Sequence, residues 1–143
     1  LKTQIEQTKL RTKIIFTGRV PHDEVVSYYS LIDITPFPRK SLPVTEMVSP
    51  MKPFEAMAME KLVICSDVSA LTEIVNHEVT GLLFSKDNPE SLADTLLLGI
   101  NDSELRNRLG RQAREWVKKE RDWKILSQKV TQLYDSLIET SNE

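Results

Sequence analysis

The stretch from residue 49 to residue 66 constrains this chain most, because it reads as a loop, a helix and a buried strand in direct succession. Pro53 suits the first turn of a helix, where its missing N–H is not needed, and residues 56–59 are strong helix formers. The run Leu62-Val63-Ile64-Cys65 is short, apolar and largely β-branched, as expected of a strand covered on both faces. The stretch therefore predicts a helix–strand unit at the centre of the fold.

The start of this predicted helix suggests a ligand with both a phosphate and a sugar. A helix that begins from an irregular loop offers free N–H groups and a partial positive charge, which favour a phosphate. Glu55, in the first turn, is placed to accept hydrogen bonds from hydroxyls beside that phosphate. A purely structural interpretation stays open, in which Glu55 only complements the helix dipole.

Strands and helices alternate on both sides of this unit. Apolar runs predict further strands at residues 13–18, 33–38 and 82–84, and Pro21 opens a predicted helix at 21–31. Residues 39–50 read as a loop, and helical spacing predicts helices that start near Asn88, Asn101 and Trp123. We therefore expect an α/β fold with a Rossmann-like parallel sheet and flanking helices.

Ligands of parallel sheets bind at the carboxyl ends of the strands. In this chain the turns after Gly18, after Pro36 and around Pro50 follow predicted strands or lead into the central helix. We expect these three turns to meet on one side of the sheet.

Composition excludes several classes of protein. The 143 residues are 40% hydrophobic and 28% charged, as in a soluble globular domain, and the net charge of -2 gives no support for nucleic-acid binding. The single cysteine, Cys65, excludes an internal disulfide, favours a reducing compartment and reads as a buried apolar residue. No apolar run approaches the roughly 20 residues of a membrane span. Because the chain begins with Leu1, we expect it to be part of a longer protein.

Five segments stand out by their order and their spacing. Four of them are residues 14–20, 33–36, 72–75 and 80–84. The most diagnostic is Phe54-Glu55-Ala56-Met57-Ala58-Met59-Glu60-Lys61-Leu62-Val63-Ile64-Cys65-Ser66-Asp67. In the right order and with the right gaps, the five segments resemble the carboxy-terminal, donor-binding domain of retaining GT-B glycosyltransferases, the group 1 family. The sequence differs from the common family pattern at Glu60 and Leu62, where glycine and proline are usual. We expect those two differences to alter only the turn.

The resemblance also implies site residues. Family members carry two glutamates separated by seven residues, the first near the transferred sugar and the second on the ribose hydroxyls. Glu55 matches the second, whereas the first position falls on Met47, and Glu46 lies one residue earlier. Members with a Pro-x-Lys-Pro segment, here residues 50–53, share this departure, so Glu46 is the expected first glutamate.

The remaining expected donor-binding residues come from the two turns. Lys52 is expected at the diphosphate, with Gly18 and Arg19 from the glycine turn and Ser49, Pro50 and Met51 from the loop before the helix. Each charged residue in this set also has an ordinary interpretation as a solvated surface side chain, and so does Glu46.

The resemblance implies a retaining transferase of the hexosyl type, bacterial in kind and cytoplasmic, with a UDP- or GDP-sugar as donor and no metal or other cofactor. The acceptor, whether a glycan, a lipid or a small molecule, stays open, as does a place at the inner face of a membrane through a missing domain. Residues 1–143 would form one donor-binding domain, the truncated carboxy-terminal half of the GT-B fold, inactive without the amino-terminal acceptor domain. The terminal helix at 123–138 would cross toward that domain. Two alternatives stay open: a non-catalytic nucleotide-sugar-binding module, and a nucleotide-sugar epimerase with the same architecture.

Overall fold

The computed structural model describes Ile5 and residues 8–140. Three parallel strands form one sheet in the order β1-β2-β3, with β1 at Ile34–Phe37, β2 at Leu62–Ser66 and β3 at Leu82–Phe84. Thr35 lies opposite Val63, and Cys65 lies opposite Leu83. The predicted α/β fold with a parallel sheet and flanking helices is therefore confirmed.

The central strand β2 is buried at every residue, and its side chains alternate between two apolar layers. Val63 and Cys65 pack with α4 (Lys52–Ala58) and α7 (Ser103–Glu120) on one face. Leu62 and Ile64 pack on the other face with α6 (Pro89–Asn101). Burial on both faces explains why the sequence of this strand is a continuous apolar run.

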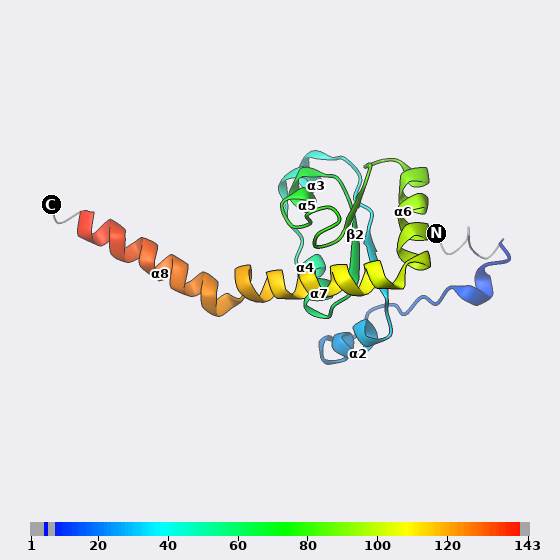
Figure 1. Ribbon diagram of the computed structural model, residues 1–143, viewed down its shortest axis with the longest axis horizontal. Coiled ribbons are helices and arrows are strands. Elements are labelled where there is room, and N and C mark those ends of the chain that lie inside the picture. The colour runs from blue at the N-terminus through cyan, green and yellow to red at the C-terminus, as the bar shows by residue number, and fades with distance from the viewer. Residues whose placement is uncertain (1–4, 6–7, 141–143) are drawn as a thin grey trace.

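The helices that position the functional residues are short. α3 (Pro43–Met47) lies between β1 and α4, and α5 (Ser69–Thr72) follows β2. α3 packs against α5, and Figure 1 shows the two helices together at one end of the sheet. The sequence predicted only a loop over residues 39–50, and the structure corrects this. α3 escaped notice because five residues are too few to show helical periodicity.

A second correction concerns residues 13–18, which were expected to form a buried strand. The structure has a single turn of 3-10 helix at Arg11–Lys13 followed by irregular backbone, and the Ile15 side chain is 86% exposed. An apolar run can form a strand only where a neighbouring strand accepts its backbone hydrogen bonds. The described sheet consists of β1, β2 and β3 and does not include this segment. The helix predicted at 21–31 is shorter than expected, with a 3-10 turn at His22–Glu24 and α2 at Val25–Ser30.

The last helix, α8 (Trp123–Thr140), projects away from the rest of the molecule (Figure 1). Trp123, Val130 and Leu133 all lie on it with more than half of their surface exposed, at 76%, 51% and 60%. Its start agrees with the predicted helix at 123–138. Within the described residues, no helix combines the length and the apolar character that crossing a bilayer would require.

Candidate functional site

The carboxyl ends of the three strands lie at one edge of the sheet, because all three strands run in parallel. β1 continues into residues 38–42 and α3, β2 into α5, and β3 into the segment that contains Lys86. This edge is where parallel α/β sheets bind ligands. The same edge holds Glu46, whose carboxylate accepts more side-chain and backbone hydrogen bonds than any other described side chain.

Glu46, on α3, accepts four hydrogen bonds from three separate segments. Its Oε1 atom accepts from Lys86 Nζ at 2.6 Å and from Ser41 Oγ at 2.7 Å. Its Oε2 atom accepts from the backbone N–H of Ser69 at 2.6 Å and from Ser69 Oγ at 2.8 Å. These donors, with Lys86 the largest contributor, lower the pKa of Glu46 to about 2. We call these four residues the Glu46 clamp.

A second anchor holds the far end of α3. The Arg39 guanidinium donates to the carbonyl oxygen of Val48 at 2.6 Å, and the Arg39 backbone N–H donates to Ser66 Oγ at 3.0 Å. The connection from β1 through α3 is therefore fixed to the end of β2. Sequence reasoning missed Arg39, Ser41, Ser69 and Lys86. Their positions just after the three strands were the available signal.

The start of α4 carries the predicted Lys52 and Glu55, both with exposed side chains, around a buried Pro53. Pro53 is the second residue of the helix, close to its predicted place. The backbone N–H groups of Phe54 and Glu55 donate to the Met51 carbonyl, so these two donors serve the helix itself. The three predicted residues Ser49, Pro50 and Met51 connect α3 to α4.

Glu55 faces α2 as well as solvent. Its Oε2 atom accepts a hydrogen bond from the Tyr29 hydroxyl at 3.4 Å, close to the upper limit for such a bond. Partial burial and the Glu55 carboxylate raise the pKa of Tyr29. In the part of the chain that the structure describes, Glu55 Oε1 has no recorded donor, so this carboxylate keeps acceptor capacity for a ligand.

Two predicted residues lie apart from this group. Gly18 adopts the expected left-handed turn, with a φ of 68°. The segment of Gly18 and Arg19 leads into α2, which lies on the opposite side of α7 from α3 and α5 in the view of Figure 1. Of the three turns that were expected to meet, the one after Pro36 and the one around Pro50 are joined through α3, whereas the Gly18 turn leads into α2.

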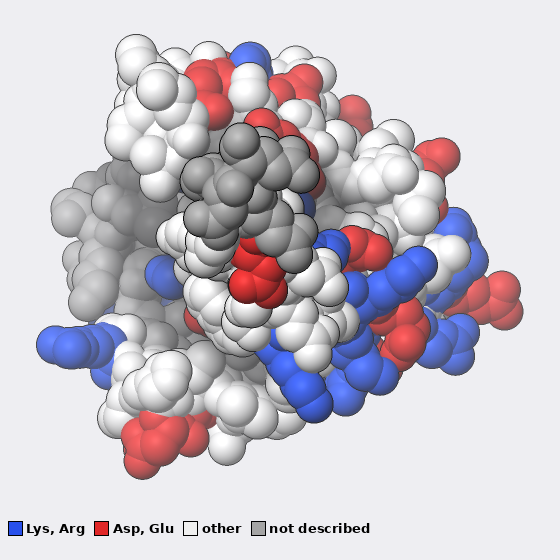
Figure 2. All heavy atoms as spheres, turned by 90° about the vertical axis from the view of Figure 1, so that its left-hand side faces the viewer, with Lys and Arg blue, Asp and Glu red and all other residues white. Residues whose placement is uncertain are grey.

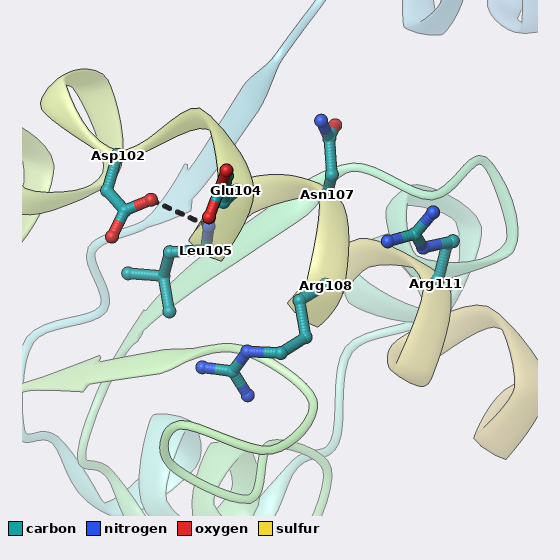
Figure 3. A pocket seen from close by; sticks show the side chains of 6 residues that line it. All are labelled: Asp102, Glu104, Leu105, Asn107, Arg108 and Arg111. Atoms are coloured by element: carbon teal, nitrogen blue, oxygen red, sulfur yellow. Dashed lines mark hydrogen bonds between the residues drawn. The ribbon is translucent and has the colours of Figure 1, made fainter.

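A hollow of about 470 Å³ lies at the same edge, lined by Pro38, Arg39, Lys40, Phe84, Asp87, Asn88, Pro89 and Leu92. A larger one, about 540 Å³, lies elsewhere, at the start of α7 (Figure 3). There Asp102 caps the helix by accepting from the Leu105 backbone N–H at 2.8 Å, and Arg108 donates to the Glu78 carbonyl. None of the predicted site residues lines this larger hollow.

The charged surface carries both signs. Figure 2, which views the molecule from the side where α8 projects, shows Lys and Arg side chains interspersed with Asp and Glu side chains. Among the described residues, no group of three or more His, Cys, Asp or Glu side chains could hold a metal ion.

Comparison with known proteins agrees with this architecture. MJ1178 of Methanocaldococcus jannaschii, an uncharacterized glycosyltransferase, is 36% identical over 120 residues, which cover 84% of this chain and 32% of that protein. Sucrose-phosphate synthase from Thermosynechococcus elongatus superimposes with a TM-score of 0.83 at 27% identity, over 97% of this chain and 34% of that one. Anabaena HepE in complex with UDP-glucose gives a TM-score of 0.80 at 19% identity, over 94% and 35%, a likeness of fold alone.

The chain thus spans about a third of the length of the curated relatives that it matches. The structural neighbours are GT-B glycosyltransferases, so the parallel sheet and its flanking helices are a part of that fold. The sequence matches the family described as glycosyl transferases group 1 over residues 1–116, which is most of the chain. The chain therefore belongs to the glycosyl transferases group 1 family.

Proposed function

We propose that this chain is the donor-binding, carboxy-terminal half of a retaining glycosyltransferase that transfers a hexose from a nucleoside-diphosphate sugar. The observation that carries the proposal is the exposed Glu55 at the start of α4, next to the connection that leads from α3. Its setting at the carboxyl ends of a parallel sheet supports the same assignment. HepE, which shares the fold, has been solved with UDP-glucose, and this supports a nucleotide-sugar as the ligand.

In the proposed complex, each residue acts on a different part of the donor. Glu55 accepts hydrogen bonds from the two ribose hydroxyls, because an ionised carboxylate accepts such pairs well. Lys52 and the start of α4 face the diphosphate, where negative charge grows as the glycosidic bond breaks. Ser49, Pro50 and Met51 line the same approach, whereas Gly18 and Arg19 would reach the diphosphate only from the α2 side. Glu46 lies at the sugar end and would reach a sugar hydroxyl by exchanging one of its present donors.

The reaction proposed is substitution with retention of configuration. The bond between the sugar C1 atom and the phosphate oxygen breaks, and its electron pair leaves with the diphosphate. The acceptor hydroxyl attacks C1 from the same face, and its proton passes to the leaving phosphate. No protein nucleophile, metal or other cofactor takes part. This differs from glycosidases, in which two carboxylates act across the bond.

The acceptor would bind to a second domain outside this chain. The chain's share of its relatives' length, about a third, supports that division. We expect the chain alone to be inactive and the full-length protein to be active in the cytoplasm. α8 would cross toward the second domain, because its exposed apolar face needs a partner to cover it.

The proposal is tested with Glu55→Ala in the full-length protein. Calorimetry measures the dissociation constants of UDP-glucose and GDP-mannose. We expect whichever nucleotide-sugar binds the wild type to bind the variant at least about tenfold more weakly. Glu90→Ala is the matched control, because Glu90 also lies in the first turn of a helix near a proline. Equal affinity and turnover in the wild type and Glu55→Ala would refute the assignment.

The same assays separate the other candidate functions. Donor binding without turnover, over a panel of acceptors, would indicate a non-catalytic binding module. Conversion of the nucleotide-sugar to its epimer, without transfer, would indicate an epimerase.

A further inference from the structure

The Glu46 carboxylate has no acceptor capacity left. A carboxylate offers about four lone-pair positions, and Glu46 uses them on Lys86, Ser41 and the backbone N–H and hydroxyl of Ser69. All four distances lie between 2.6 and 2.8 Å, which is short and typical of bonds to an ionised acceptor. The side chain is therefore fixed in one orientation.

The donors come from the three segments that follow the three strands. Ser41 follows β1, Ser69 follows β2 and Lys86 follows β3. Of the residues that the structure describes, Lys86 is the one cation that donates to Glu46, and 37% of its side chain is exposed. Removing the Lys86 charge would leave a clamp of neutral donors around an ionised carboxylate.

Lys86 is itself held by its neighbours. Its backbone N–H donates to Asp67 Oδ1 at 2.7 Å, and Asp87 accepts from the Ser41 backbone N–H at 3.2 Å. The carboxylates that act on Lys86 are Glu46, Asp67 and Asp87, and together they raise the pKa of Lys86. Among the donors that lower the pKa of Glu46, Lys86 contributes most, ahead of the bonds from Ser69 and Ser41.

We propose that Lys86 is a positioning residue of the donor site, which holds the Glu46 carboxylate and so fixes α3 beside the sugar end of the donor. This inference rests on the function proposed above, because that function places a nucleotide-sugar beside Glu46. Lys86 touches no reacting atom in this scheme and acts only through Glu46.

The test is Lys86→Met in the full-length protein, which removes the charge and keeps an unbranched side chain. We expect kcat/KM for the nucleotide-sugar to fall between about tenfold and about a hundredfold, as for a displaced catalytic group. The Kd of the free nucleoside diphosphate, which lacks the sugar, should stay within about twofold of wild type. Lys118→Met is the matched control, because Lys118 forms an exposed ion pair with Glu115 on α7, at 3.2 Å.

Two further measurements separate a positioning role from general loss of structure. In a Glu46→Gln background, Lys86→Met should cause no additional loss, because the group through which it acts is already neutral. Carboxyl NMR of glutamate-labelled protein, assigned with Glu46→Gln, should show the Glu46 pKa near 2 in wild type and raised by more than about one unit in Lys86→Met.

Three results would overturn the inference: wild-type kcat/KM in Lys86→Met, losses that multiply in the double variant, or an unchanged Glu46 pKa. Failure of the proposed function has a different signature. In that case the wild-type protein transfers no sugar, while the pKa measurement still reports whether Lys86 controls Glu46.

Discussion

At the scale of single residues, the candidate site contains two glutamates with very different surroundings. Glu46 has four donors between 2.6 and 2.8 Å, whereas within the described part of the chain the Glu55 carboxylate has one side-chain donor, Tyr29, at the long distance of 3.4 Å. A ligand hydroxyl can therefore bind Glu55 at little cost but must displace an existing donor to bind Glu46. This contrast favours Glu55 over Glu46 as the residue that contributes more to the affinity for the proposed nucleotide-sugar.

Cys65 illustrates a residue whose burial decides its chemistry. Burial raises the pKa of the Cys65 thiol to about 12, well above the value of about 8.5 for a free thiol. We expect no labelling of Cys65 by a thiol reagent at pH 8 in the folded protein and rapid labelling in denaturant. Mass spectrometry of the Cys65 peptide measures the labelled fraction. Because the unfolded thiol ionises first, this group's contribution to stability is present below about pH 8.5 and is lost as the pH rises toward 12. Fast labelling of the native protein would contradict this.

Glu60 offers a second residue-scale prediction. It has a φ of 58° in the turn between α4 and β2, a conformation that suits glycine. We expect Glu60→Gly to raise the free energy of unfolding by about 0.5–1 kcal/mol, measured by urea denaturation. The ion pair of Glu60 with Arg114, at 3.6 Å, is largely exposed and contributes less than this.

The matched control for this change is Glu60→Ala, which removes the same carboxylate but keeps a Cβ atom. It should not stabilise the protein. If Glu60→Gly were no more stable than Glu60→Ala, the left-handed backbone would not be the cause.

At the scale of elements, the parts that could be predicted are those whose signal is local. β2 was predicted from its continuous apolar run, which its burial at every residue explains. α6 was predicted from Asn88, which caps the helix by accepting from the Ser91 backbone N–H. The segment at 13–18 has the same local signal as a strand but lies outside the described sheet, and membership of a sheet is a tertiary property. α3 was missed because five residues are too few to show helical periodicity, and side chains from other segments hold it in place.

The candidate site divides in the same way. Lys52 and Glu55 were found because they lie within one recognisable stretch. Arg39, Ser69 and Lys86 were not, because their roles depend on three strands whose ends meet only in the folded chain. Glu46 was named for a role at the sugar, and the structure adds contacts to α5 and Lys86 that no local pattern contains.

The packing of α7 on the turn before β2 gives a prediction for an element interface. A Cβ atom on Gly110 would overlap the Glu60 backbone carbonyl, and would lie 2.8 Å from its carbon atom. We expect Gly110→Ala to destabilise the protein by about 1–3 kcal/mol or more, because backbone cannot yield as a side chain can. Thermal unfolding of the purified protein measures this.

Gly99 on α6 is the comparison, because its Cβ would meet the end of the Leu62 side chain at 2.7 Å. That side chain can move, and alanine favours a helix by about 1 kcal/mol over glycine. Gly99→Ala should therefore cost clearly less than Gly110→Ala. Equal effects would mean that α7 can shift away from the turn.

At the scale of the whole molecule, the two apolar layers on either side of β2 form one continuous unit, and α8 stands outside it. The exposed apolar residues Val130, Leu133 and Tyr134 recur at helical spacing on α8, so they share one face. Such a face is usually covered by another surface in the working protein. In the proposed two-domain enzyme, that surface belongs to the acceptor domain.

The chain of residues 1–143 alone should therefore self-associate through α8. We expect its sedimentation-velocity profile to shift to larger species with rising concentration, because association removes the apolar face from water. The double substitution Val130→Glu with Leu133→Glu should return the chain to a monomer. Gln128→Glu with Gln132→Glu adds the same charge on the opposite side of the helix and should leave association unchanged. A monomeric wild-type chain at all concentrations, or equal effects of the two pairs, would show that the α8 face does not drive contact between molecules.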